Sequence, residues 1–236
     1  MLKVLIADKL SPSAVDAFRA AGIEATVETG LAEDALIARI AGYDGLVVRS
    51  ATQVTAAVLA AGERLKVVGR AGIGIDNVDL PAATAKGIVV MNTPYGNSIT
   101  TAEHTIALLM ALARGLPAAD RSTRAGKWEK SRFMGVEVAG KTLGLVGCGN
   151  VGSIVANRAQ GLRMKVLIYD PYVSPERAAE LAVEKVDLDE LLARADFLSL
   201  HVPLTDQTRA MIDAAAMAKM RPGVRIINCA RGGLVV

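Results

Sequence analysis

The chain has 236 residues, of which 52% are hydrophobic, 22% charged and only 3% aromatic, and its formal net charge is +3. At about 150 residues per domain, this length predicts one or two domains, and the composition excludes a disordered chain. Lysines and arginines are scattered, which argues against a nucleic-acid-binding protein. No apolar run reaches the roughly 18 residues of a membrane helix. Cys148 and Cys229 lie far apart and form no metal-type cluster. We therefore expect a soluble, cytoplasmic protein that binds no metal, membrane or nucleic acid.

Short apolar segments alternate with amphipathic segments through the N-terminal part of the chain. Alternation of this kind predicts a parallel sheet covered by helices, because right-handed crossovers place a helix between successive strands. We expect strands at 3–7, 25–28, 45–49, 65–69 and 88–92. We expect helices from Pro12 to near Gly22, and at 32–41, 56–61 and 79–85.

A long helical pattern follows, from Thr100 past Ala113, with a break near Pro117 and a continuation to Arg124. Beyond it a second α/β series begins. We expect its strands at 142–146, 165–169, 197–200 and 224–228, and its helices at 151–162, 188–193 and 214–220. The predicted fold is α/β, with two Rossmann-like or flavodoxin-like doubly wound parallel-sheet domains joined through the long helix. We place a substrate-binding domain at 1–96 and a nucleotide-binding domain at 97–236.

The sharpest motif is a G-x-G-x-x-G formed by Gly147, Gly149 and Gly152, directly after one predicted strand and at the start of a helix. Its glycines permit a tight turn, close approach of the backbone to a pyrophosphate, and close packing of helix on strand. The next strand ends at Asp170, a carboxylate suited to an adenosine ribose and repulsive to a 2′-phosphate. The motif therefore predicts NAD rather than NADP.

Further motifs stand in one order: Gly69–Asn77, Val90–Pro94, Gly126–Glu129 and Asn228–Gly233. Together they resemble those of the D-isomer-specific 2-hydroxyacid dehydrogenases. Within that family, the segments 48–52, 92–98 and 133–135 are most similar to the branch that acts on 3-phosphoglycerate. The resemblance implies NAD-dependent oxidation of 3-phosphoglycerate to 3-phosphohydroxypyruvate, the first step of L-serine biosynthesis. It also implies a homo-oligomer, either a dimer or a tetramer.

The resemblance also assigns site residues. Arg231 becomes the catalytic carboxylate clamp, a role suited to a guanidinium because it binds carboxylates bidentately. Ile73 joins the cofactor contacts, although the phosphoglycerate branch often has Thr there. The substrate residues are Arg49, Ser50, Arg70, Gly72, Gly74 and Asn97. The cofactor residues are Ile73, Gly147, Gly149, Asn150, Val151, Gly152, Asp170, His201, Val202, Cys229 and Ala230.

The family's proton acceptor is a histidine in a Pro-His motif, oriented by a glutamate, and both lie beyond the arginine strand. This sequence holds only His104 and His201, and neither matches that motif. We expect the His/Glu segment to fall outside these residues, so that the chain is a fragment or is completed by a partner chain. Two alternatives stay open: a hydroxypyruvate or glyoxylate reductase, and a non-catalytic NAD(H)-binding sensor or corepressor-like protein.

Overall fold

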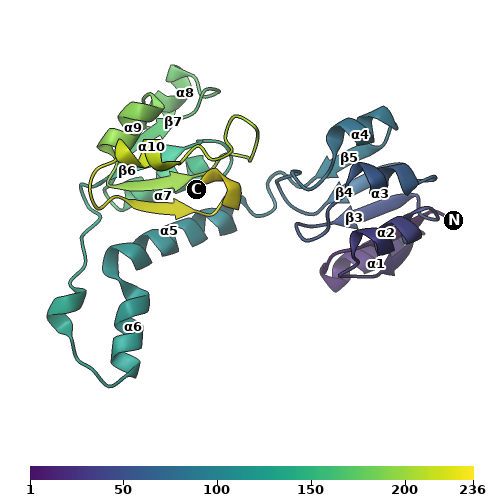
Figure 1. Ribbon diagram of the computed structural model, residues 1–236, viewed down its shortest axis with the longest axis horizontal. Helices are drawn as coiled ribbons and strands as arrows, with labels where there is room; N and C mark the ends of the chain where they lie inside the picture. Colours follow the sequence, from purple (N-terminus) through teal and green to yellow (C-terminus); the bar gives the residue numbers. More distant parts are fainter. The chain divides into compact units, whose positions relative to one another are not determined.

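The computed structural model describes all 236 residues, and the chain divides into two units, Met1–Asn97 and Ser98–Val236 (Figure 1). Each unit has its own parallel sheet of five strands with helices packed against it. This architecture confirms the predicted α/β fold with two doubly wound sheets.

The sheet of the first unit has the strand order β2-β1-β3-β4-β5, so the chain reverses direction across the sheet between β1 and β3. This order is that of flavodoxin-like folds. All five predicted strands are present, with ends shifted by at most two residues. The elements are β1 (Lys3–Ile6), α1 (Pro12–Ala20), β2 (Glu24–Val27), α2 (Glu33–Ile40), β3 (Gly45–Val48), α3 (Ala56–Ala61), β4 (Val67–Arg70), α4 (Leu80–Ala85) and β5 (Val89–Asn92).

The short helices of this unit begin at residues that satisfy free main-chain N–H groups. The Thr55 side chain accepts a hydrogen bond from Val58 N at the start of α3, and Asp79 accepts one from Ala82 N at the start of α4. Apolar side chains of α2, α3 and α4 then pack on one face of the sheet. The largest of them that are fully buried are Leu36, Ile40 and Leu59.

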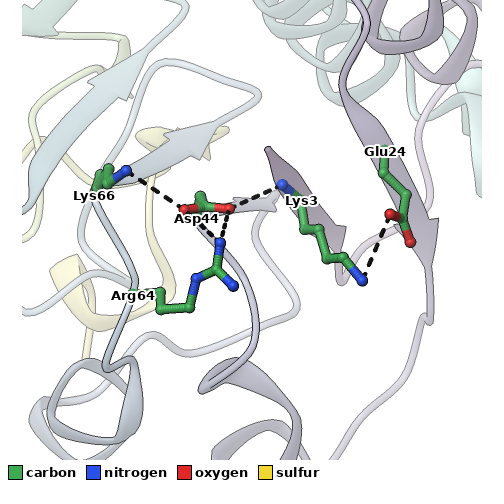
Figure 2. A network of polar contacts seen from close by, with 5 residues as sticks. All are labelled: Lys3, Glu24, Asp44, Arg64 and Lys66. Atoms are coloured by element: carbon green, nitrogen blue, oxygen red, sulfur yellow. Dashed lines mark hydrogen bonds and ion pairs between the residues drawn. The ribbon is translucent and has the colours of Figure 1, made fainter. Parts of the chain in front are cut away.

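An ion network joins the amino ends of the strands in this unit, and Figure 2 shows it around Asp44. The buried Asp44 carboxylate accepts the main-chain N–H of Lys3 at 3.0 Å. It also pairs with Arg64 at 3.1 Å and with Lys66 at 3.5 Å. Lys3 in turn pairs with Glu24 of β2 at 3.6 Å. The network therefore ties the beginnings of β1, β3 and β4 together.

The second unit has the strand order β10-β9-β6-β7-β8, the order of a Rossmann fold in which the chain reverses between β6 and β9. The predicted strands are all present, but the structure adds four elements that we did not expect, η1, α8, β8 and η2. The elements of this unit are α5 (Ser98–Arg114), α6 (Leu116–Arg124), a 3-10 turn η1 (Lys130–Phe133), β6 (Thr142–Val146), α7 (Gly152–Gly161), β7 (Lys165–Tyr169), α8 (Pro175–Glu180), β8 (Glu184–Lys185), α9 (Leu188–Arg194), β9 (Phe197–Leu200), α10 (Ala214–Ala218), β10 (Arg225–Asn228) and η2 (Gly232–Leu234).

The long helix α5 is part of the second unit rather than a free connector. Ala102, Leu109 and Ala113 lie on one face of α5 and are buried in the core that α7 and the sheet also line. The helix ends where Gly115 takes a positive φ of 61°, and α6 follows with a proline in its first turn. None of the helices in the structure is both long and apolar enough to cross a membrane.

We expect Asp44→Asn to destabilise the fold at neutral pH. The N–H of Lys3 and the Arg64 guanidinium hold the pKa of Asp44 below its ordinary value of 3.8. A carboxylate with a lowered pKa in the folded state contributes stability above its ordinary pKa, and this contribution is lost as the pH falls through the folded value. Urea unfolding should therefore show a lower midpoint for the variant, with a difference that narrows below pH 3.8.

Asp16→Asn is the matched control, because Asp16 pairs with Arg19 at 3.1 Å on the surface, where both side chains are largely exposed. Exposed pairs of this kind contribute little to stability. A midpoint that drops equally in both variants would contradict the role given to Asp44.

Candidate functional site

The glycine-rich loop of the second unit lies at the carboxyl end of β6, where the sheet order reverses. Gly147 has a positive φ of 93°, and a Cβ added there would lie 2.7 Å from the carbonyl oxygen of His201. A Cβ at Gly152 would lie only 2.2 Å from the carbonyl oxygen of Gly147. Only glycine fits at these two positions, because the clash in each is with main-chain atoms that cannot move aside.

Gly149 is different, because a Cβ there would meet no atom of the protein within 4 Å. Protein packing therefore gives no reason for glycine at this exposed position. The open space lies on the loop that leads into the N-terminus of α7, where the helix dipole favours an anion. These residues fit the pyrophosphate of a dinucleotide.

Asp170, at the end of β7, is buried and holds this loop in place. Its Oδ2 accepts the N–H of Cys148 at 2.8 Å, and its Oδ1 accepts the N–H of Tyr172 at 2.8 Å. Each carboxylate oxygen can accept a second hydrogen bond, so capacity remains for ribose hydroxyls. The structure thus gives Asp170 a loop-fixing role that the motif did not predict, and its ribose contact stays a prediction.

Two titratable side chains beside the loop are uncharged at neutral pH. Burial, followed by the charge of Asp170, raises the pKa of the Cys148 thiol to about 11. Burial lowers the pKa of His201 to about 4, and its Nε2 is 2.9 Å from the Ser199 hydroxyl. Cys148 is therefore an inert filler of the loop, and His201 is a poor proton acceptor.

The segment after β10 carries Arg231, and Asn228 shapes it. The Asn228 Oδ1 accepts the N–H of Ala230 at 3.0 Å, and its Nδ2 donates to the carbonyl oxygen of Arg231 at 2.7 Å. Arg231 itself is partly exposed and donates to the Ala230 carbonyl at 2.9 Å. Sequence reasoning missed Asn228 as a site residue, although an Asn at the end of a strand is a typical signal for such a turn.

The remaining predicted cofactor contacts of this unit lie on the same edge of the sheet. Val202 and Ala230 are partly buried against the apolar core beside β9 and β10. Val151 packs against the core on the other face of the sheet, whereas Asn150 is exposed. Cys229 is partly exposed.

The first unit brings its two predicted anion-binding arginines to one edge. Val48 at the end of β3 pairs in register with Arg70 at the end of β4, so Arg49 and Arg70 lie at the carboxyl ends of neighbouring parallel strands. Arg49 and Ser50 are exposed, and Arg70 is partly buried. Ligands collect at such carboxyl ends, next to the point where the strand order reverses.

The loop after β4 carries Gly72, Ile73 and Gly74, and β5 holds it. Thr93 N donates to the Gly72 carbonyl at 3.0 Å, and Asn92 Nδ2 donates to the Ile73 carbonyl at 2.7 Å. Asn97 is exposed and is the last residue of the first unit. The fold therefore places the substrate residues 49–50 and 70–74 on one edge of this sheet.

Residues 106–236, more than half of the chain, match the model of the "D-isomer specific 2-hydroxyacid dehydrogenase, NAD binding domain". The chain belongs to this dehydrogenase family. The matched segment contains the glycine-rich loop, Asp170 and Arg231, so in this family these residues lie within the NAD-binding domain.

Similar members of the family come from distant organisms. The D-3-phosphoglycerate dehydrogenase of Archaeoglobus fulgidus is 50% identical over 99% of this chain, and the match covers 44% of that protein. The TT0316 protein of Thermus thermophilus superposes with a TM-score of 0.91 at 35% identity, covering all of this chain and 76% of that one. An NAD⁺-bound 3-phosphoglycerate dehydrogenase of Entamoeba histolytica superposes with a TM-score of 0.83 at 32% identity, covering 99% of this chain and 73% of that one. The chain thus spans less than half the length of the Archaeoglobus relative.

We expect Gly149→Ala to weaken NADH binding without changing stability. The added methyl group meets no protein atom within 4 Å but occupies the space in front of the loop. A loss of about tenfold in affinity corresponds to ~1.4 kcal/mol. Fluorescence titration with NADH and thermal unfolding would measure the two effects.

Gly152→Ala serves as the contrast, because its Cβ would lie 2.2 Å from a main-chain oxygen and must disturb the fold of the loop. That variant should lose both stability and NADH binding. Unchanged NADH affinity in Gly149→Ala would contradict a pyrophosphate at this loop.

Proposed function

We propose that this chain carries the cofactor and substrate sites of an enzyme that oxidises 3-phosphoglycerate to 3-phosphohydroxypyruvate with NAD, in the first step of L-serine biosynthesis. The observation that carries the proposal is the placement of Arg49 and Arg70 at the carboxyl ends of neighbouring parallel strands of the first unit. Two guanidinium groups on one edge suit the phosphate of the substrate. The identity to phosphoglycerate dehydrogenases over nearly the whole chain supports the same substrate.

The chain's own residues have separate roles in this proposal. The glycine-rich loop would hold NAD⁺, which would supply the hydride acceptor for C2 of the substrate. Arg231 binds the substrate carboxylate and polarises the C2 oxygen, and Asn228 keeps the Arg231 segment in place. Arg49, Ser50 and Arg70 hold the phosphate.

The proton of the substrate hydroxyl needs an acceptor, and His201 does not suit this task. Its pKa of about 4 makes it a weak base at neutral pH, and the Ser199 hydroxyl lies 2.9 Å from Nε2. His201 instead supports the loop through its carbonyl group, which lies against Gly147. We propose that the acceptor belongs to a segment outside these 236 residues.

We propose further that the protein works in the cytoplasm as a homo-oligomer. Leu108 and Leu112 of α5 are four residues apart and are 38% and 46% exposed, and Leu116, at the start of the separate helix α6, is 52% exposed. Leucines at this spacing share one face of a helix, so their exposure suits burial against a second copy. A monomeric mass in solution would contradict this part of the proposal.

The proposal is tested by titrating the 236-residue chain with NADH and with 3-phosphoglycerate, and by assaying the same samples for NAD reduction. We expect saturable binding of both ligands and no turnover. Arg231→Lys should bind 3-phosphoglycerate about tenfold more weakly, because an ammonium group lacks the bidentate geometry of a guanidinium.

The other outcomes separate the alternatives. Equal affinity for unphosphorylated glycerate, with indifference to Arg49→Gln, would indicate a hydroxypyruvate or glyoxylate reductase. NADH binding that changes association with another protein, without any 3-phosphoglycerate binding, would indicate a sensor.

Asp170→Ala should change the preference between the two dinucleotides. The variant loses a charge-assisted hydrogen bond to the ribose, so NADH should bind about tenfold more weakly. It also loses the repulsion of a 2′-phosphate, so the affinity for NADPH should rise relative to the affinity for NADH. Because Asp170 also holds the loop, the ratio of the two affinities is the informative quantity, since a loosened loop weakens both ligands equally. An unchanged ratio would contradict the ribose contact.

A further inference from the structure

The loop that carries Arg49 and Ser50 is fixed by a buried carboxylate from β1's carboxyl end. Asp8 is only 5% exposed. Its Oδ2 accepts the N–H of Arg49 at 2.5 Å and the N–H of Thr52 at 3.2 Å. Its Oδ1 accepts the Thr52 hydroxyl at 3.0 Å. One carboxylate therefore binds both ends of the loop 49–52.

A buried amide fixes the carbonyl groups of the same loop. Asn77 is 7% exposed, and its Nδ2 donates to the carbonyl oxygens of Arg49 at 2.6 Å and Thr52 at 2.7 Å. Its own main chain is anchored, because Val54 N donates to the Asn77 carbonyl at 2.8 Å. The peptide groups at the two ends of the loop are thus held by side chains from two other parts of the unit.

The middle of the loop is left without protein partners. The N–H groups of Ser50 and Ala51 and the Ser50 hydroxyl make no hydrogen bond within the structure, and both residues are exposed. Two successive free N–H groups form a favourable environment for an anionic oxygen. The Arg49 guanidinium extends from the same loop.

We propose that Asp8, Thr52 and Asn77 are positioning residues for the phosphate of the substrate. They hold the 49–52 loop so that the free N–H groups of Ser50 and Ala51, the Ser50 hydroxyl and Arg49 face the ligand in a fixed arrangement. Binding to a loop that is already ordered avoids the entropy cost of ordering it. This role rests on the proposed function, which places the phosphate at Arg49 and Ser50.

The negative charge of Asp8 is compatible with an anion site nearby, because three donors already surround its two oxygens. An asparagine in its place can keep most of these bonds. Its oxygen accepts the two N–H groups, and the Thr52 hydroxyl, which also lies 3.4 Å from the Ala7 carbonyl, accepts from the new NH₂ group and donates to that carbonyl. Alanine keeps none of them.

The test is a titration of the ¹⁵N-labelled 236-residue chain with inorganic phosphate and with 3-phosphoglycerate, followed through the amide signals of Ser50 and Ala51. The wild-type chain should show saturable shifts of both signals. Asp8→Ala should weaken binding of both ligands by about tenfold or more, and Asp8→Asn should restore it to within about threefold. Thr52→Val, which removes one hydroxyl and keeps the side-chain shape, should show an intermediate loss.

Asp44→Ala is the matched control, because Asp44 is also a buried aspartate of this sheet that accepts a main-chain N–H, but at the amino ends of the strands. It should lower stability without changing phosphate affinity. NADH titration of each variant checks that the second unit is intact.

Unchanged phosphate affinity in both Asp8→Ala and Thr52→Val would overturn the positioning role, as would an equal loss in Asp44→Ala. If the wild-type chain binds NADH but neither phosphate nor 3-phosphoglycerate, the proposed substrate fails and the positioning role fails with it. If the wild-type chain binds phosphate and 3-phosphoglycerate but the Asp8 variants bind them with the same affinity, only the positioning role fails.

Discussion

Each sheet depends at its functional edge on a buried aspartate that accepts main-chain N–H groups from a loop. Parallel strands end at one edge, and the loops that leave it carry N–H groups with no strand partner. A carboxylate offers only acceptors, so it can satisfy two or three of these groups at once. Asp8 does this for the loop after β3, and Asp170 does it for the glycine-rich loop after β6. In the loop after β3, the N–H groups of Ser50 and Ala51 then remain free for a ligand.

The amino edges of the two sheets use the same interaction for stability. Asp44 accepts the N–H of Lys3 at 3.0 Å, and Asp196 accepts the N–H of Thr142 at 2.8 Å. Each of these aspartates precedes the strand that lies beside the first strand of its unit, and each also pairs with an arginine, Arg64 or Arg221. The two units thus share a local structural repeat that a comparison of their residues does not reveal.

The sequence was sufficient to predict every strand except β8 and most helices, because short segments rich in apolar residues alternate with helical patterns. It was not sufficient for α8 and β8. β8 consists of Glu184 and Lys185, whose polar side chains carry no strand signal, and its pairing depends on β7. For α8 a signal did exist, since Ser174 caps the helix and Pro175 occupies its first turn.

The supporting residues of the site were beyond sequence reasoning for a different reason. Asp8 contacts residues 41 and 44 positions away, and Asn77 contacts residues 28 and 25 positions away. A local sequence pattern does not predict such contacts, because they depend on the order of the strands in the sheet. The glycines and Asp170 could be predicted from the sequence, because the dinucleotide motif is local and a separate physical requirement explains each of its residues. Even there, the second role of Asp170 depended on a contact across 22 residues.

The electrostatics around Cys148 bear on the choice of cofactor. The Asp170 charge contributes to the raised pKa of that thiol, although burial contributes more, and Arg177 opposes it. The Asp170 charge therefore makes the electrostatic potential at this end of the loop more negative, although the N-terminus of α7, which follows, has the opposite effect. Under the proposed function, Asp170 would accept hydrogen bonds from the ribose hydroxyl groups, and the residues towards Gly149 and α7 would hold the phosphates. A 2′-phosphate in the same place would meet a carboxylate whose charge only two N–H groups offset. Under the proposed function, the carboxylate that shapes the loop also disfavours the phosphorylated dinucleotide, so loop geometry and cofactor preference would depend on one side chain.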